Sequence, residues 1–545
     1  MSRVVVLMVL LAAVLAAPAA AGTAERTGRV LVSVEPGVRA VAVAASARAE
    51  GPRVEEIGLV TVRPAAGRRV EDVVRELRGR KFVRAVEVER RFTPRAVPDD
   101  AALHEAETSP GVAPGTPVQW WVAKLGLPEA WAAEDGAGAR VGIVDSGVDG
   151  THPELATKIV GEVDADPTPG HGGARTDEAG HGTHVAALAC AATNNAIGIA
   201  GAGGGCGLLV GKTDFSDASV AQAIVALADA GAEVINLSFG TDGTRAPPQA
   251  LIDALDYARG KGAVLVAAAA DSVTDEQGDP ANLLQPSGTA DDLGHDDGLS
   301  VTAATHSDQR AWFAGRGAQI SLAAYGAYER DAGPRGLLSA WPQSPTTFEQ
   351  GSFGPPPLPP CRCRTPFRGD PRYAHLQGTS MATALVSGIA ALVRHLNPDL
   401  SPREVVRLLK WTARRPAGTG WGPELGWGIV DAQAAVEAAR TTDRRPPVSR
   451  VRARVRAGGR IALRWSGRDD APPGVEASGI DKYELWRASP GGRSARLLTT
   501  AATRHTVRAT TPGRYTFFTL AVDRAGNREA KPSRPDATVR VGPRR

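Results

Sequence analysis

The stretch GTSMA at residues 378–382 runs directly into TALVSG at residues 383–388. The second run is small and apolar, which predicts the start of a buried helix. Ser380 therefore places a hydroxyl at a helix N-terminus, where free backbone N–H groups can stabilise a developing negative charge. Because Gly-x-Ser turns are common and mostly structural, this motif indicates chemistry only if partners for the serine occur elsewhere.

Two further segments supply such partners. An apolar run at 139–144 predicts a strand that ends at Asp145, and GHGTH at 180–184 places His181 at the start of a second helix. An alcohol is a weak nucleophile until a base removes its proton, and imidazole titrates near neutral pH. We interpret Asp145, His181 and Ser380 as a catalytic triad in which Asp145 holds the correct tautomer of His181. The alternative is that these are three unrelated strand-end and helix-cap residues.

The order Asp, His, Ser and these three neighbourhoods resemble the subtilisin-like serine proteases, or subtilases, over roughly residues 116–440. The resemblance implies an α/β fold of three layers with a parallel sheet. Helical and strand patterns also alternate between the histidine and the serine, as such a sheet requires. We expect helices at 218–230, 247–261 and 403–413, and strands at 232–237 and 263–269.

The chain has 43% hydrophobic residues and 62 glycines, which suits two or three folded domains and excludes a disordered or fibrous chain. Residues 1–21 have one early arginine, an apolar run and an alanine-rich end, as in a cleaved secretory signal. A membrane anchor is the alternative. We therefore expect a secreted, extracellular protein. It would also be associated with the cell envelope if its basic C-terminal residues bind anionic polymers of the envelope.

Residues 22–115 are interpreted as a propeptide and linker. Between 28 and 95 the pattern is strand, helix, strand, helix, strand, which resembles the ferredoxin-like propeptide of subtilases, an intramolecular inhibitor. Residues 94–117 are rich in proline, alanine and acids, so we expect an exposed linker that is cleaved between about Phe92 and Pro117. A small α/β domain that is never removed is the alternative.

Residues 441–545 alternate like the strands of a β-sandwich and resemble immunoglobulin- or fibronectin-like modules. They hold 23 Lys and Arg against 9 Asp and Glu, a balance of +14, whereas residues 116–440 carry −13. This charge suits contact with the catalytic domain or with anionic cell-envelope polymers, and a merely solvated basic surface is the alternative. No motif supports binding to nucleic acid.

The resemblance implies that protein or peptide substrates bind between two walls. One wall is Ser238, Phe239 and Gly240, and the other is Ala267, Ala268 and Ala269. A peptide added as a strand gains affinity from main-chain hydrogen bonds and selectivity from alternate side chains. Because both walls are small or apolar, we expect an endopeptidase with a broad, mostly apolar preference. Acidic residues at 271, 275 and 276 leave a basic preference open.

The segment 193–201 resembles a calcium loop of the family. The resemblance implies that Ca²⁺ is bound by Glu154, Thr193, Asn195, Ile197 and Ile199, with Gln119 as a further oxygen donor. Oxygen-only ligation suits Ca²⁺. A metal-free loop is the alternative, and no organic cofactor is expected.

The four cysteines at 190, 206, 361 and 363 allow three pairings. Export favours disulfides, and Cys190 with Cys206 would clip the predicted calcium loop. Cys361 and Cys363 lie in a proline-rich insertion from about 326 to 374, where free thiols that bind a metal are the alternative.

One departure from the family matters for function. Subtilases usually have Ala-Gly-Asn where this chain has Ala269-Ala270-Asp271, and that asparagine donates to the oxyanion. Ionised Asp271 cannot donate. We therefore expect a secreted serine endopeptidase, and the alternative is a catalytically weak or inactive subtilase-like protein that serves binding or adhesion.

Overall fold

The computed structural model describes residues 26–35, 48–54, 58–65, 68–78, 80–90, 97–354, 357–416, 418, 420–472 and 474–543. Its contacts divide the chain into two compact units, Met1–Ala96 and Val97–Arg545. Each unit is described by itself. The signal sequence expected at 1–21 and the first helix expected after Gly37 lie outside the described residues.

The first unit contains an antiparallel sheet with strand order β2-β3-β1-β4. Its elements are β1 (Arg26–Val34), β2 (Arg48–Val54), β3 (Leu59–Arg63), α2 (Val70–Arg78) and β4 (Val83–Arg90). Val30, Val32 and Val34 alternate along β1 and are buried with Val73 and Leu77 of α2, as a half-buried strand requires. Three strands and the second helix expected here are present, whereas β2 was not expected. The ferredoxin-like fold of this unit and its role as a propeptide remain predictions.

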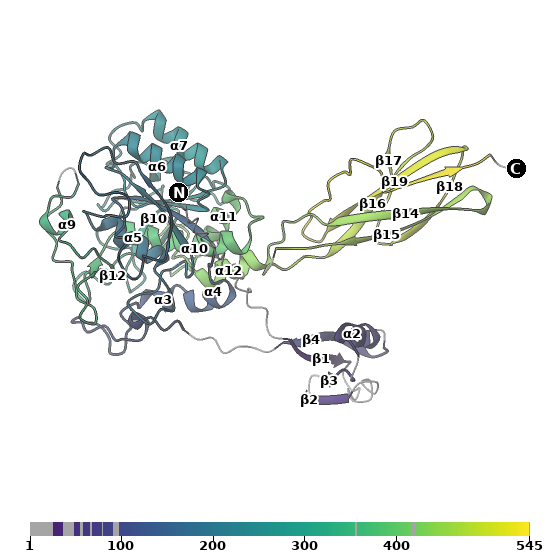
Figure 1. The fold of residues 1–545 in the computed structure, drawn as a ribbon, viewed down its shortest axis with the longest axis horizontal. Helices are drawn as coiled ribbons and strands as arrows, with labels where there is room; N and C mark the ends of the chain where they lie inside the picture. The colour runs from purple at the N-terminus through teal and green to yellow at the C-terminus, as the bar shows by residue number, and fades with distance from the viewer. Residues whose placement is uncertain are drawn as a thin grey trace, which may run out of the picture. The chain divides into compact units, whose positions relative to one another are not determined.

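The second unit is built on a parallel sheet with strand order β11-β10-β9-β8-β5-β7-β6 (Figure 1). Its strands are β5 (Arg140–Asp145), β6 (Ile159–Asp164), β7 (Gly207–Lys212), β8 (Val234–Leu237), β9 (Val264–Ala268), β10 (Leu299–Ala304) and β11 (Leu322–Tyr325). The central strands are continuous apolar runs because helices cover both faces of the sheet.

Two hydrophobic clusters, one on each face, make this a three-layer fold. One cluster contains residues of α3 (Trp121–Lys124), α4 (Leu127–Ala133), α5 (His181–Cys190), α10 (Thr379–Leu396), α11 (Pro402–Thr412) and α12 (Ala432–Thr441). The other contains residues of α6 (Asp217–Asp229), α7 (Gln249–Gly260) and α8 (Ala281–Leu284). The fold expected from the sequence is confirmed, with element ends shifted by one or two residues.

Helix α10 alone, within the part of the chain that the structure describes, has the length and hydropathy of a membrane span. Its apolar window is 83% buried inside the protein, which identifies it as the core helix of the second unit.

The segment that follows residue 96 packs against the second unit. Residues 101–103 form a short 3-10 helix (η2, Ala101–Leu103), and Ala102 has no exposed surface. The expectation of an exposed linker from 94 to 117 is therefore wrong for this part, because the apolar side chains of η2 are buried in the core.

The insertion expected from about 326 to 374 contains regular secondary structure. Its elements are β12 (Leu337–Ala340), which pairs with β13 (Tyr373–Leu376), and α9 (Thr347–Gln350). Trp341 is fully buried, and disulfides join Cys190 to Cys206 and Cys361 to Cys363. Free thiols are absent from the described residues.

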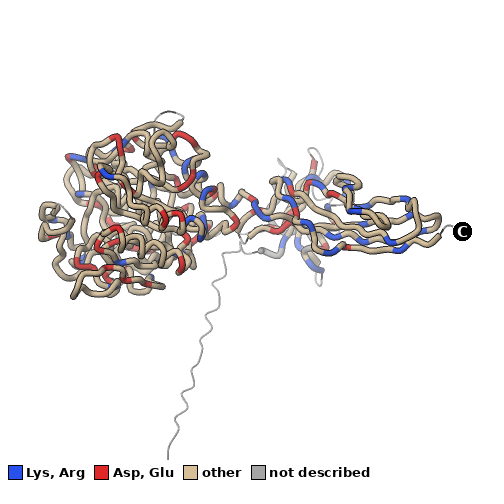
Figure 2. Tube along the Cα trace, turned by 90° about the horizontal axis from the view of Figure 1, so that it is seen from above, with Lys and Arg blue, Asp and Glu red and all other residues tan. Residues whose placement is uncertain are grey.

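The C-terminal residues form two antiparallel sheets, β14-β15-β18 and β17-β16-β19-β20, which share one hydrophobic core. Lysine and arginine are frequent along this part of the chain (Figure 2). Their strands are β14 (Val448–Arg456), β15 (Arg460–Arg468), β16 (Ile480–Ala488), β17 (Ala495–Thr500), β18 (Arg504–Arg508), β19 (Gly513–Asp523) and β20 (Ala537–Val541). A β-rich C-terminal region is confirmed, and its kinship with immunoglobulin or fibronectin modules remains a prediction.

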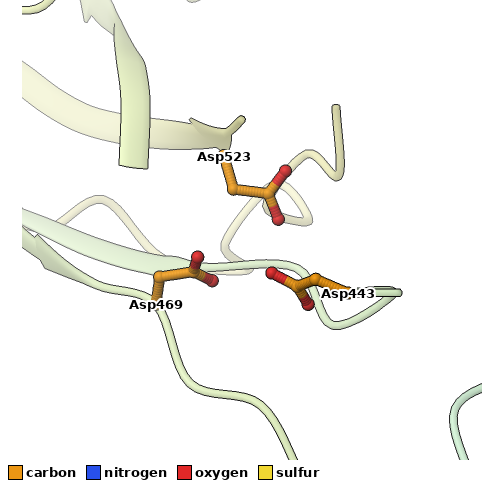
Figure 3. A group of neighbouring side chains, drawn as sticks. All are labelled: Asp443, Asp469 and Asp523. Carbon is orange, nitrogen blue, oxygen red and sulfur yellow. The ribbon is translucent and has the colours of Figure 1, made fainter. Parts of the chain in front are cut away.

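Asp443, Asp469 and Asp523 approach one another where the chain enters these sheets (Figure 3), with one oxygen from each within 4.8 Å. Their carboxylates accept backbone N–H groups, including those of Ser478 and Gly479. Burial and the two neighbouring carboxylates raise the pKa of Asp469. This acidic cluster therefore ties together loops that enter and leave both sheets.

Candidate active site

Asp145 and His181 meet where strand β5 ends and helix α5 begins. Nδ1 of His181 lies 2.8 Å from Oδ1 of Asp145, and Asp145 is 1% exposed. Gly180 precedes the helix with φ 91°, and a Cβ there would lie 2.6 Å from the ring of Trp341. A side chain at this position would clash with Trp341, which explains the glycine before the histidine.

Asp177 organises the surroundings of this pair. Its Oδ1 accepts the hydroxyl of Ser146 at 2.9 Å and the N–H of Gly180 at 2.8 Å, and its Oδ2 accepts the N–H and hydroxyl of Thr183. Burial of Asp177 raises its pKa. The sequence analysis missed this positioning residue, although an acid four residues before the histidine is a signal that could have found it.

Ser380 lies in the first turn of α10, next to the strand segment after β8. Its Oγ donates to the carbonyl of Ser238 at 3.0 Å, and Oγ of Ser238 donates to the carbonyl of Ser380 at 3.0 Å. Asn236 and Ser387 extend this network from β8 to α10. Helix α10 and the segment that follows β8 are therefore held together by buried polar contacts.

Asp271 lies just after β9 and caps the N-terminus of α10. Its Oδ1 accepts the N–H of Thr379 at 2.8 Å, and the Thr379 hydroxyl lies 3.0 Å from the same oxygen. Asp271 is an exposed residue, although nearby protein atoms partly desolvate its carboxyl. This desolvation raises its pKa, although Thr379 and the charge of His181 oppose the shift.

The imidazole of His181 lies among three acids. Burial disfavours its charged form, but the carboxylates of Asp145, Asp177 and Asp271 outweigh burial and raise the pKa of His181. Only the neutral imidazole can accept a proton, and this form is lost as pH falls through the raised pKa of His181.

An aromatic cluster covers the exposed face of the imidazole. Phe353, from the insertion, stacks on His181 with ring centroids 5.8 Å apart, and Phe348 lies 5.3 Å from Phe353. Phe215 contacts both Phe353 and Phe239 and has φ 62°, which is rare for a bulky residue. The sequence did not identify these rings, because their contacts join distant segments.

A family model described as the subtilase family matches residues 136–428. This chain belongs to the subtilase family. Thermitase of Thermoactinomyces vulgaris is 32% identical over 330 residues, which cover 58% of this chain and 96% of that protein. An extracellular protease of Xanthomonas campestris is 29% identical over 471 residues, which cover 78% of this chain and 70% of that protein.

Among solved structures, a protease from Pseudoalteromonas arctica PAMC 21717 is 27% identical, with a TM-score of 0.48, and covers 61% of this chain and all of that chain. With the family established, this chain is a subtilisin-like serine endopeptidase.

The two expected substrate walls of this subtilase lie side by side, because β8 pairs with β9 up to Leu237 and Ala267. Gly240 is exposed and Phe239 is half-buried, so the first wall offers backbone and an aromatic ring. Ala267 is fully buried in the cluster beneath α6 and α7, so its side chain cannot contact a peptide. Ala268 and Ala269 are each 5% exposed and remain candidates for the second wall.

The residues expected to bind calcium form hydrogen bonds with other groups of the protein. Glu154 is fully buried, and its carboxylate accepts the N–H of Ile199, the side-chain amide of Asn195 and the hydroxyl of Tyr373. The carbonyl of Ile197 accepts a backbone N–H from Ala101. Oxygen ligands for Ca²⁺ must point inward together, whereas here hydrogen-bond donors converge on the carboxylate.

The remaining expected ligands also have other partners. The hydroxyl of Thr193 donates to the carbonyl of Ala191, and Gln119 exchanges two hydrogen bonds with the backbone of Ala200. Asp100, with no exposed surface, accepts the N–H of Asn194 at 2.8 Å. The donor set does not fit a calcium ion, and residues 99–103 hold the loop.

We expect the melting temperature of the wild-type protein to be the same in millimolar CaCl₂ and in a chelator. The variant Asp100→Ala should have a free energy of unfolding that is lower by about 1–3 kcal/mol. The variant leaves the backbone N–H groups of Asn194 and Asn195 without this acceptor. Thermal denaturation of both proteins with and without calcium measures this. A rise of several degrees in wild type on adding calcium would contradict it.

Proposed function

We propose that this chain is a secreted serine endopeptidase in which Asp145, His181 and Ser380 form the catalytic triad. The observation that carries the proposal is the 2.8 Å contact between buried Asp145 and Nδ1 of His181, beside a serine at the N-terminus of α10. In this role His181 takes the proton of Ser380, and Asp145 stabilises the imidazolium. Attack requires the Ser380 hydroxyl to leave the Ser238 carbonyl and donate to Nε2 of His181.

Secretion is proposed on three grounds. The first 21 residues have the composition of a secretory signal, and two disulfides suit an oxidising compartment. One relative is named an extracellular protease. The first unit would then act as a propeptide and inhibitor that the enzyme removes, and the mostly apolar walls suit a broad, mostly apolar substrate preference.

The second candidate function is a weak or inactive subtilase that binds rather than cuts. One observation favours it: a carboxylate, Asp271, caps α10 where the family has a donor to the oxyanion. The basic C-terminal sheets suit adhesion to anionic envelope polymers under either function.

A fluorophosphonate probe separates the two candidates because it reacts only with an activated serine. We expect labelling of one residue, Ser380, in the full chain and complete loss of labelling in Ser380→Ala. Ser352→Ala, which removes an exposed hydroxyl of the insertion, is the matched control and should label fully. Absence of labelling in folded wild type would support the binding protein.

Self-processing predicts that Ser380→Ala accumulates as a precursor that begins near Gly22, whereas wild type loses the first unit. We place the cut before Asp99, because Asp99 and Asp100 bond the loop at 194–196 and belong with the second unit. N-terminal sequencing identifies the ends after both proteins are expressed without residues 1–21 in a cell-free system. Equal trimming of both proteins there would show that processing is not autocatalytic.

The substitution Asp271→Asn should raise kcat, and the gain should grow with pH to about 100-fold at pH 8. Asparagine keeps the acceptor for Thr379 and adds an amide donor for the oxyanion. Loss of such a donor from subtilisin costs about 10²- to 10³-fold in kcat, which sets the size of the expected gain.

The pH dependence follows from the two raised pKa values. Wild-type activity requires neutral His181 and protonated Asp271, so it falls on both sides of a maximum. In Asp271→Asn, activity should still fall at low pH, because His181 becomes protonated, but it should no longer fall at high pH. Asp275→Asn, at an exposed carboxylate paired with Arg316, is the matched control. An equal or lower kcat for folded Asp271→Asn at pH 8 would show that Asp271 does not face the oxyanion.

A further inference from the structure

The outward face of the sheet β14-β15-β18 is covered by arginines. Odd-numbered residues of β14 and β15, such as Val451, Ile461 and Leu463, belong to the core, so even-numbered residues point outward. The outward face carries Arg450, Arg452, Arg454, Arg456, Arg460, Arg464, Arg468, Arg504 and Arg508. We call these nine residues the arginine face, and all nine are exposed.

The strand register aligns these charges in rows. Arg452 is opposite Arg464, which is opposite Arg504. Arg456 is opposite Arg460, which is opposite Arg508. Like charges directly opposite each other destabilise a sheet. Two rows of three arginines on adjacent strands are therefore a cost to folding unless an anion neutralises them.

Acidic partners are nearly absent from the arginine face. Among the described residues, Arg468 alone of the nine forms an ion pair, with Asp470. Acidic residues of these sheets lie elsewhere: Glu484 pairs with Arg528 and Arg496, and Glu529 binds Ser449. The positive charge of this face is left for a partner outside the described residues.

The side chains of the arginine face favour one kind of anion over others. All nine cations are arginine, whose planar guanidinium binds phosphate through two parallel hydrogen bonds. Outward residues between the arginines are small, such as Ala462, Ser466 and Thr506. The outward positions of these three strands carry no aromatic ring on which nucleic-acid bases stack, and their one large apolar side chain is Val448 at the start of β14, which is too little to enter a membrane.

We propose that the arginine face is a binding site for a linear, phosphate-bearing polymer without bases. Arginines recur at roughly 6.8 Å along β14, at roughly 13.6 Å along β15 and β18, and at about 4.8 Å between strands, so an extended chain of phosphates meets several guanidinium groups at once. The site goes beyond peptide hydrolysis, because no residue of the triad lies in these sheets. It would hold the protease on such a polymer while the active site remains free.

The test uses the full chain with Ser380→Ala, which prevents self-digestion, and long-chain inorganic polyphosphate as the probe. The row variant changes Arg452, Arg464 and Arg504 to Gln. The control variant changes Arg493, Arg514 and Arg534 to Gln, which removes equal charge from exposed positions outside the face. Titration calorimetry from 50 to 300 mM NaCl gives the affinity and its salt dependence.

We expect the row variant to bind polyphosphate about 10- to 100-fold more weakly at low salt, with a slope of log K against log salt reduced by about 2–3. The control variant should bind within about threefold of the parent. The row variant should melt at the same or a higher temperature, because like charges are removed. A merely structural role would lower that temperature.

Three results would overturn the proposal. The first is the absence of binding by the parent protein, which would leave a solvated basic surface. The second is an equal loss of affinity in both variants, which would reflect net charge alone. The third is tighter binding, at equal charge, to oligo-dT or to phosphatidylglycerol vesicles than to polyphosphate, which would assign the face to nucleic acid or to a membrane. Weaker binding to polyglutamate than to polyphosphate supports the phosphate assignment.

Discussion

Close packing of helix α10 through the centre of the second unit is the constraint on which the active site depends. Ser380 is at one end of this helix, and its position is only as precise as the fit of the helix between β8 and α5. At Gly388 a Cβ would lie 2.6 Å from the backbone N of Gly203 and 2.8 Å from the carbonyl of Ala189. Close-packed interiors tolerate no such addition without a shift. The small residues of α10 therefore fix the position of Ser380.

A second constraint is electrostatic. Asp145, Asp177 and Asp271 surround the imidazole of His181, and together they favour its charged form, which develops during catalysis. Because the same carboxylates raise the pKa of His181, they lower the fraction of neutral His181 at low pH. Asp271 couples the histidine to the N-terminus of α10, so the helix end and the general base belong to one charged network. This coupling distinguishes the site from one with a neutral amide at that position.

The C-terminal sheets differ from the rest of the second unit in the arrangement of their surface charges. Their core is ordinary, with aromatic and aliphatic side chains between two sheets. Their surface charge is not ordinary, because the strand register brings arginines opposite one another on three strands. Burial of the inner face stabilises these sheets strongly enough to tolerate like charges on the outer face, which leaves that face available for an anionic partner.

The sequence by itself determined the features that depend on local pattern. Apolar runs and helical patterns located the central strands and helices to within one or two residues, and the motifs around Asp145, His181 and Ser380 identified the family. Local periodicity carries such information because each strand or helix buries its own face. Only the tertiary structure decided what depends on contacts between distant segments. Asp177 binds Ser146, Phe353 covers His181, Asp271 caps α10, and residues 99–103 hold the loop around Asn195 instead of a metal. The rows of the arginine face likewise arise from strand register, which the spacing of arginines along the chain does not specify. These contacts join residues tens to hundreds of positions apart, and folding alone brings them together.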